Sequence, residues 1–326
     1  MADRPPVNVV VLMPVRDDWT SAAELIRQID KTIPSDACAL DIVMVDDGSA
    51  QPCTPADFQG NFSAVRAISA LRLCSNVGHQ RAIAIGLAHL HNSKNCDAVV
   101  VMDADGEDTP QGMAQLLRAY SENRGSEAIF AERSRRSESL VFRVFYQIFK
   151  ILHRGLTGIS VRVGNFSILP FPYLDTLVVR SELWNHYAAT VFRSRLAFSM
   201  VRIPRGSRIA GTTRMNFVSL VTHGLSAISV FGDIVGVRIM IWALAGSVLA
   251  VLGMIAVVLI RLFTSSAIPG WATYAAGILA IVMMQLITIA ASFTFFMLAN
   301  RTNLGFVPVR DYRIFVKKEV GIYPNE

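Results

Sequence analysis

Two long apolar runs near the C-terminal end most constrain what this chain can fold into. They cover residues 239–260 and 271–299, and the second is interrupted only by Gln285 and a few serines and threonines. A helix needs about 20 consecutive apolar residues to cross the core of a bilayer, so each run is long enough. The alternative, a buried helical pair in a soluble protein, is disfavoured because the second run exceeds ordinary globular helix lengths. We therefore expect a transmembrane hairpin over residues 239–299.

Basic residues flank this hairpin, whereas its connecting loop, residues 261–270, carries a single charge. The flanking cations are Arg238 on one side and Arg301, Arg310, Arg313, Lys317 and Lys318 on the other. The positive-inside rule then predicts that both termini are cytoplasmic, in an inner cell membrane. The chain opens MADRPP and passes straight into a strand-like run, so we expect no N-terminal signal. The expected division is a catalytic domain at 1–215, a juxtamembrane amphipathic segment at 216–238, the hairpin at 239–299 and a cytoplasmic tail at 300–326.

The composition agrees with a membrane-associated protein. The net charge is +6, and 52% of the residues are hydrophobic. The basic residues lie near the membrane-proximal segments, including an amphipathic stretch at 140–156 and another candidate at 217–231. Anionic head groups or phosphorylated ligands account for them, so we expect no nucleic-acid partner. The four cysteines show neither a CxxC pair nor metal-ligand spacing, and are predicted to be reduced structural thiols.

The part before the hairpin alternates between strand and helix patterns. Continuous apolar runs at 7–15 and 98–102 are typical of strands that are covered on both faces. Further strands are predicted at 41–45 and 65–73, and helices at 78–91 and 110–123. This alternation favours an α/β fold with a doubly wound, mostly parallel sheet, whose ligands bind at the carboxyl ends of the strands.

Acidic residues follow two of these predicted strands. Asp46 and Asp47 end one, and Asp103 and Asp105 lie just after another. Two carboxylates that are two residues apart at a strand end can converge on a hard cation such as Mg²⁺, which takes its other oxygen ligands from phosphates and water. The alternative is a solvated acidic turn, but the apolar strand in front and the second acidic strand end favour a metal site.

An ordered set of motifs carries a family resemblance. The segments VVVLMPVRDD, DIVMVDDGS, CSNVGHQRAIAIGL and AVVVMDADGEDTP resemble those of family 2 glycosyltransferases with a Rossmann-like GT-A fold. The later segments AERSRRSES, GNFSILP and RGSRIAGTTRMN, followed by two spans, resemble the polyprenyl-phosphate group. That group includes dolichol-phosphate mannose synthases and the bacterial enzymes that load glucose or a related sugar onto undecaprenyl phosphate.

This resemblance implies roles for particular residues. Those lining the donor nucleotide would be Pro14, Asp46, Asp47, Asn76, Gly78, Arg81 and Asp103. Asp103 and Asp105 would hold Mg²⁺ or Mn²⁺ against the donor diphosphate and, with Asn165, form the catalytic set. Arginines bind phosphate through a planar fork; those matching family acceptor-phosphate patterns are Arg133, Arg136, Arg205, Arg208 and Arg214. Each arginine has the alternative of facing solvent or lipid head groups.

One segment departs from the pattern of many bacterial relatives. Where they have Gly-Asp-Phe-Arg-Leu, this chain has Asn165 in place of the acid and Ser167 in place of the arginine. An acceptor phosphate is largely ionised at neutral pH, its second pKa being about 6, and needs little help from a base. The missing arginine implies that other arginines hold the acceptor phosphate, or that the acceptor differs.

The resulting expectation is a membrane-anchored, inverting glycosyltransferase that moves one sugar from a nucleotide donor to a polyprenyl phosphate at the cytoplasmic face. UDP-glucose or a similar hexose donor is favoured over a GDP-sugar, and relatives imply a homo-oligomer. The alternatives are a transferase acting on a hydroxyl of another lipid or a polysaccharide, and an inactive membrane scaffold. The intact Asp46, Asp103 and Asp105 argue against a scaffold.

Overall fold

The computed structural model describes residues 6–133, 147, 154–158, 163–210, 217–264, 270–302 and 305–324. The chain divides into two compact units. We call the first the sheet unit; it comprises residues 1–140, 161–230 and 305–326. We call the second the hairpin unit; it comprises residues 141–160 and 231–304.

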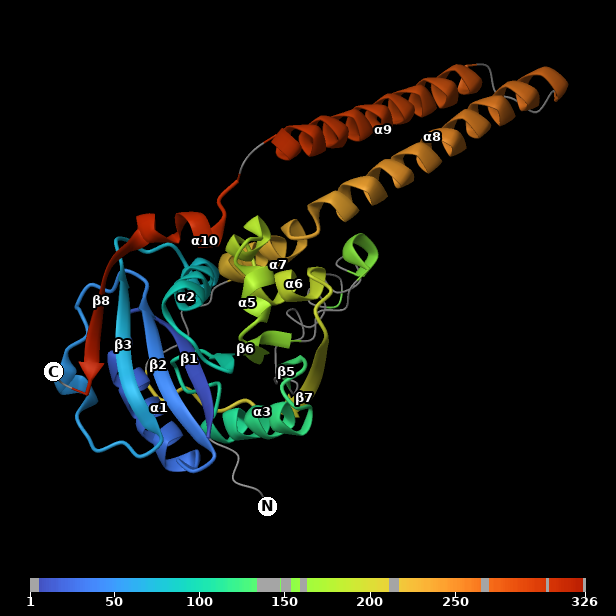
Figure 1. Cartoon of the computed structure of the whole chain (residues 1–326). Helices are drawn as coiled ribbons and strands as arrows, with labels where there is room; N and C mark the ends of the chain where they lie inside the picture. Colours follow the sequence, from blue (N-terminus) through green and yellow to red (C-terminus); the bar gives the residue numbers. More distant parts are fainter. Residues whose placement is uncertain are drawn as a thin grey trace. The chain divides into compact units, whose positions relative to one another are not determined.

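The sheet unit is built on an eight-stranded sheet with the order β7-β5-β6-β4-β1-β2-β3-β8 (Figure 1). The strands are β1 (Val7–Val15), β2 (Cys38–Asp46), β3 (Val65–Leu73), β4 (Ala98–Val101), β5 (Ala128–Arg133), β6 (Val163–Pro170), β7 (Phe198–Ile203) and β8 (Val316–Tyr323). Only β6 and β8 run antiparallel to their neighbours among these strands. The mostly parallel sheet predicted from the sequence is therefore confirmed, and β1 and β3 have the predicted bounds.

Helices cover both faces of this sheet, which explains why the central strands are apolar without alternation. Along β1, Val9 and Val11 pack in a core with α1 (Trp19–Thr32) and α3 (Pro110–Glu122). Val10 and Leu12 point to the opposite core, with α2 (His79–Ser93), α5 (Tyr173–Leu177) and α6 (Tyr187–Arg193). Truncating such a fully buried leucine to alanine costs about 2–5 kcal/mol.

Gly86 brings α2 close to the sheet. A Cβ atom at this position would lie 2.6 Å from Cδ1 of Leu12 and 2.8 Å from Cγ2 of Val45, so a larger residue would push the helix away. The N-terminus of α2 is thereby fixed near the carboxyl ends of β1 and β2, where the site lies.

The last part of the chain returns to the sheet unit. After the hairpin, α10 (Pro308–Asp311) and a 3₁₀ turn (Tyr312–Phe315) lead into β8, which pairs antiparallel with β3. Glu319 of β8 lies 3.2 Å from Nε2 of His89 on α2. Residues 305–324, expected from the sequence to be a tail, therefore supply an edge strand and part of the second core.

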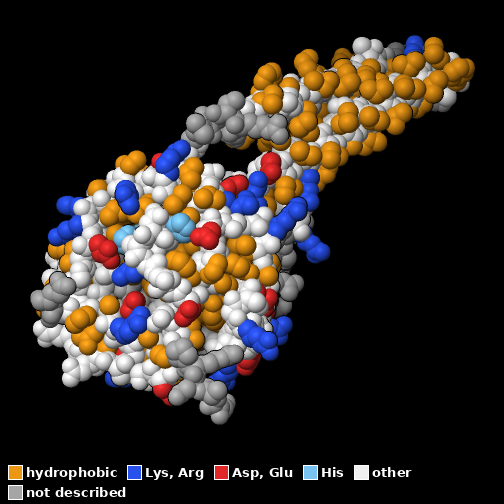
Figure 2. Space-filling model, viewed as in Figure 1, with side chains coloured by type: hydrophobic (Ala, Val, Ile, Leu, Met, Phe, Trp, Pro, Cys, Tyr) orange, Lys and Arg blue, Asp and Glu red, His pale blue; other side chains and the backbone are white. Residues whose placement is uncertain are grey.

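The hairpin unit contains α8 (Gly232–Phe263) and α9 (Trp271–Thr302). Both helices are long and apolar enough to cross a membrane, as the sequence predicts, and hydrophobic side chains cover their visible face (Figure 2). Glycines of α8 allow α9 to pack closely: a Cβ on Gly246 would lie 2.9 Å from Leu286, and one on Gly253 would lie 3.2 Å from Leu279.

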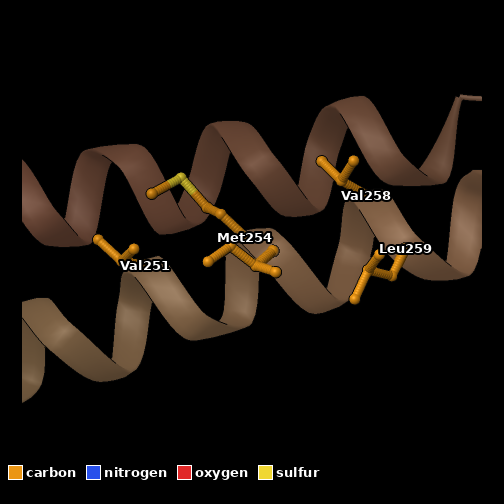
Figure 3. A pocket seen from close by; sticks show the side chains of 5 residues that line it. Val251, Met254, Val258 and Leu259 are labelled. Carbon is orange, nitrogen blue, oxygen red and sulfur yellow. The ribbon is translucent and has the colours of Figure 1, made fainter.

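A shallow hollow on α8 is lined by Val251, Met254, Ile255, Val258 and Leu259 (Figure 3). Its lining offers only hydrocarbon and one thioether, so it has no group that could bind a sugar, a phosphate or a metal. The amphipathic segments expected from the sequence are described only in part. Residues 140–146, 148–153 and the side chains of residues 217–220 and 223 lie outside the described residues, whereas α7 spans Phe217–Ser229.

Candidate active site

The predicted donor residues gather at the carboxyl edge of the parallel strands. Pro14 is opposite Val45 in the β1–β2 register, so β1 and β2 end together at Val15 and Asp46. β4 lies on the other side of β1, and Asp103 lies two residues after its last residue, Val101. The fold thus brings Pro14, Asp46 and Asp103 to one edge, as expected from strand ends in a parallel sheet.

Asp46 and Asp47 are buried, and each has a distinct set of partners. The Asp46 carboxylate accepts a hydrogen bond from the backbone N–H of Ser49 and lies 3.4 Å from Nε of Arg72. Asp47 accepts hydrogen bonds from the backbone N–H groups of Val77 and Gly78, at 2.7 and 3.0 Å. Burial nevertheless raises the pKa of Asp47, because desolvation outweighs these two bonds. In this structure Asp47 connects the end of β2 to the start of α2.

Two glycines make that connection possible. Gly48 has a φ of +68°, and a Cβ there would lie 2.6 Å from the backbone nitrogen of Asn76. Gly78 caps α2 with a φ of +93° and donates its N–H to Oδ1 of Asn76. The close approach of Gly48 to the backbone of Asn76 fixes the N-terminal end of α2 beside the strand ends. The N–H groups at a helix N-terminus favour the binding of anions.

Arg81 lies on the first turn of α2. Its guanidinium is 5.1 Å from the centroid of the Trp184 ring, a cation–π contact that holds the side chain over the aromatic surface. The predicted contact of Arg81 with a donor stays a prediction.

The acidic turn, which we define as residues 103–108, is closed by its own hydrogen bonds. Asp108 accepts from the backbone N–H of Asp103 at 2.9 Å, and Asp105 accepts through Oδ1 from the N–H of Glu107. Gly106 supplies the left-handed conformation between them, with a φ of +87°. The turn therefore presents the side chains of Asp103 and Asp105 from a fixed backbone.

Asn165 joins this region through a chain of amide contacts. In the β4–β6 register Ser167 is opposite Val101, so Asn165 lies beyond the end of β4, level with Asp103. Its Oδ1 accepts from Nε2 of Gln80, and its Nδ2 lies 2.9 Å from Nε2 of His79. The same imidazole nitrogen is 3.3 Å from Oδ1 of Asp103.

His79 and Gln80 were not among the residues predicted for the site. The available signal was their position in the GHQR sequence, directly after Gly78 at the start of a helix that faces the acidic strand ends. Gln80 is oriented by its other end, because its Oε1 accepts from the backbone N–H of Tyr187 at 2.8 Å.

Ser167 is completely buried and faces the protein interior. Its Oγ lies 2.7 Å from the hydroxyl of Tyr187 and donates to the carbonyl of Asn165. Burial raises the pKa of Tyr187, so the phenol is neutral at physiological pH. A hydroxyl pair thus occupies the position at which the resemblance leads one to expect an arginine.

Two of the five predicted phosphate-binding arginines are described with their side chains. Nη2 of Arg208 lies 2.7 Å from Oδ2 of Asp105, and Arg205 pairs with Glu107. Burial lowers the pKa of Arg205, although an arginine remains charged at neutral pH. Arg136, Arg214 and the side chain of Arg133 lie outside the described residues; the backbone of Arg133 ends β5 opposite Ile203.

The residues present suit a divalent cation that is bound partly by protein carboxylates and partly by oxygen atoms of a substrate. Within the described ranges, no group of three or more His, Cys, Asp and Glu side chains forms a cage for a metal. Two carboxylates on a rigid turn, with arginines close by, are the donor set for Mg²⁺ or Mn²⁺ completed by diphosphate oxygens and water. Asp103 and Asp105 therefore fit the predicted metal.

A mostly parallel sheet with acidic strand ends beside arginines, followed in the same chain by two candidate membrane spans, is the arrangement of a GT-A fold with a membrane anchor. The model of the glycosyl transferase family 2 matches residues 10–177, which is slightly more than half of the chain. The chain belongs to this family.

Curated relatives share most of the chain's length. One is the undecaprenyl-phosphate 4-deoxy-4-formamido-L-arabinose transferase of Salmonella choleraesuis (strain SC-B67), which is 24% identical over 83% of this chain and 81% of its own. A crystal structure of a mycobacterial protein aligns with a TM-score of 0.50 and 16% identity, over 71% of this chain and 75% of that chain. Glucosyl-3-phosphoglycerate synthase from Mycobacterium tuberculosis, solved with Mn²⁺, UDP and glucosyl-3-phosphoglycerate, aligns with a TM-score of 0.47 and 14% identity, over 71% and 80% of the two chains.

Proposed function

We propose that this protein transfers a single sugar from a nucleotide donor to a polyprenyl phosphate at the cytoplasmic face of the inner membrane, with inversion. The observation that carries the proposal is the pairing of Asp105 with Arg208 and of Glu107 with Arg205. These two ion pairs place carboxylates that can bind a metal next to guanidinium groups that can bind phosphate. They lie at the edge of the sheet where folds of this type bind ligands. The Salmonella relative named above, which acts on undecaprenyl phosphate, supports the acceptor class.

The donor would lie against the ends of β1, β2 and β4. Asp46 and Asp47 would shape the pocket for the base and ribose, and we favour UDP over GDP and glucose or a similar hexose. Asp103 and Asp105 would hold Mg²⁺ or Mn²⁺, which offsets charge on the leaving nucleotide as a Lewis acid. The N-terminus of α2 at Gly78 would add its backbone dipole to the binding of the diphosphate.

Asn165 suits an acceptor that needs no base. Its amide is bonded to Gln80 and His79 and carries no ionisable proton. An acceptor phosphate already carries negative charge at neutral pH, so its attack on the anomeric carbon depends on placement and charge compensation. The described arginines Arg205 and Arg208, together with Arg133, Arg136 and Arg214 on the segments that flank the described residues, are proposed to provide that compensation.

The strand β8 supports the proposed topology. It pairs with β3, so the segment after the two spans belongs to the same folded unit as the segment before them. Two consecutive membrane spans return the chain to the side of the membrane from which it started, which is compatible with the pairing of β8 and β3. The positive-inside rule makes that side cytoplasmic, where nucleotide sugars are available.

We also propose that the protein is a homo-oligomer in which α9 meets a second copy of itself. Gln285, Thr288 and Ser292 are spaced by three and four residues, which places them on one face of α9, and all three are exposed in the hairpin. Thr288 donates to the carbonyl of Met284, whereas the amide of Gln285 has no hydrogen-bond partner within the described part of the chain. An amide in hydrocarbon without a partner costs about 2–7 kcal/mol. A glutamine amide both donates and accepts, so two copies satisfy each other.

Membranes containing the protein, incubated with radiolabelled UDP-sugars and undecaprenyl phosphate, test the proposed reaction. We expect one labelled sugar in the lipid fraction, in a linkage that is labile to mild acid, as for a glycosyl phosphate. Label in an acid-stable lipid or polysaccharide would instead favour a hydroxyl acceptor. Absence of transfer from every UDP- and GDP-sugar would favour an inactive scaffold.

A further inference from the structure

The second acidic side chain of the proposed metal site already has a cation beside it. Nη2 of Arg208 lies 2.7 Å from Oδ2 of Asp105, and the Asp105 side chain is 13% exposed. The other oxygen of Asp105 accepts from the backbone N–H of Glu107. The oxygen nearest to Arg208 is therefore the one at which a metal would meet a charged competitor.

The backbone that carries Arg208 is held to the acidic turn independently of this ion pair. Gly206 donates its N–H to the carbonyl of Glu107, and Ile209 donates to the carbonyl of Asp105, both at 2.9 Å. The side chain of Ile209 covers Gly106, where a Cβ atom would lie 2.5 Å from Cγ1 of Ile209. Because the backbone is anchored on both sides of Arg208, its side chain can turn away while the segment stays in place.

A divalent cation and a guanidinium repel each other when both contact one carboxylate oxygen. Arg208 is 28% exposed at its side chain, so solvent or a phosphate group has access to it. An arginine released from Asp105 would remain within one side-chain length of the turn, where its planar fork can bind a phosphate bidentately.

From these contacts we propose that Arg208 is a resident counter-cation of Asp105 that a divalent metal displaces, so that binding of the metal releases the guanidinium to bind phosphate. This inference rests on the proposed metal site. It assigns to Arg208 two alternative partners, a carboxylate before the metal binds and a phosphate afterwards. It also predicts that Arg208 weakens the binding of the metal.

Binding of Mn²⁺ to the full-length protein in detergent, measured from the electron paramagnetic resonance signal of free Mn²⁺ with and without UDP, tests the inference. Arg208→Gln should bind Mn²⁺ roughly tenfold more tightly than the wild type, within the range for loss of a charge-assisted hydrogen bond. Arg208→Lys should lie between the two. Arg202→Gln is the matched control, because Arg202 pairs with Glu132 on a neighbouring strand and its side chain is 90% exposed; its Mn²⁺ affinity should equal that of the wild type.

Unchanged or weaker Mn²⁺ binding by Arg208→Gln would overturn the inference, since a merely positioning arginine would help the metal. Asp105→Asn separates this outcome from failure of the proposed function. If the wild type binds Mn²⁺ and Asp105→Asn loses it, the metal site stands whatever Arg208 does. If the wild type binds no Mn²⁺ with or without UDP, both the metal site and the displacement are refuted. Circular dichroism of each variant confirms that the fold is retained.

Discussion

Nδ2 of Asn165 lies 2.9 Å from Nε2 of His79, and the direction of this contact is set from the far side of the network. The backbone N–H of Tyr187 requires an acceptor, which fixes Oε1 of Gln80 toward it. Gln80 must then donate to Oδ1 of Asn165, which turns Nδ2 of Asn165 toward the imidazole. The same His79 nitrogen lies 3.3 Å from Oδ1 of Asp103, so the imidazole stands between the Asn165 amide and the acidic turn.

Restoring the family acid tests whether this chain needs a base. We expect Asn165→Asp to change the transfer rate by less than about tenfold, whereas a general base contributes about 10²–10⁴-fold where one is needed. The reason is that the proposed acceptor is already ionised. Initial rates over a titration of polyprenyl phosphate at fixed donor concentration provide the measurement. A gain of two orders of magnitude would point to a hydroxyl acceptor.

Removing the charge of Asp105 should abolish most of the transfer. Asp105→Asn should lower kcat/KM by about 10²–10³-fold, because a metal stabilises the developing charge by several kcal/mol and each factor of ten is about 1.4 kcal/mol. Asp41→Asn is the control, since Asp41 forms a similar pair with Arg66 near the amino ends of β2 and β3. The wild type should also lose activity in a chelator and regain it with Mg²⁺ or Mn²⁺. Full activity of Asp105→Asn would show that the acidic turn has a structural role and does not hold a catalytic metal.

The contact between Glu319 and His89 should make the docking of β8 sensitive to acid. The hydrogen bond with His89 holds the pKa of Glu319 below its ordinary value. A carboxyl group with a lowered folded pKa stabilises the fold above its unfolded pKa of about 4.3, and this contribution is lost as the pH falls through the folded value.

We therefore expect Glu319→Gln to melt at a lower temperature than the wild type at pH 7, and the two to converge toward pH 3. Thermal melting monitored by circular dichroism between pH 3 and 7 measures this difference. Glu122→Gln, at the exposed end of α3, should follow the wild type throughout. A constant difference between wild type and Glu319→Gln at every pH would exclude a role for the charge.

Replacing the mid-span amide should weaken self-association. Gln285→Leu should lower the affinity between copies by roughly 3- to 30-fold, corresponding to about 0.6–2 kcal/mol for a hydrogen bond between membrane helices. Energy transfer between labelled copies in bilayers measures this affinity. Ser247→Ala is the control, because the Ser247 hydroxyl already bonds to the Ala243 carbonyl within α8. Equal affinities for Gln285→Leu and the wild type would place the interface elsewhere.

Local pattern was enough to predict the frame of this protein. A strand buried on both faces is apolar along its length, so residues 7–15 could be assigned with their bounds. The strand at 65–73 was also assigned with its bounds, although Arg66 and Arg72 interrupt its apolar pattern. Helices that cross a bilayer must be long and apolar, so 239–260 and 271–299 fall within α8 and α9. Acidic residues at the carboxyl ends of parallel strands meet at one edge of the sheet, so the sequence by itself predicts that Asp46 and Asp103 lie at the same edge.

Contacts between distant segments required the tertiary structure, because periodicity carries no information about which segments pair. Nothing local in residues 316–323, half of which are exposed, indicates that they return past two spans to pair with β3. The pairing of Arg208 with Asp105 depends on the loop after β7 reaching the turn after β4. His79 and Gln80 became site residues only because the β4–β6 register places Asn165 beside them. The sequence thus sets which residue types stand at the strand ends, and the packing of the sheet determines which of those side chains can act on one another.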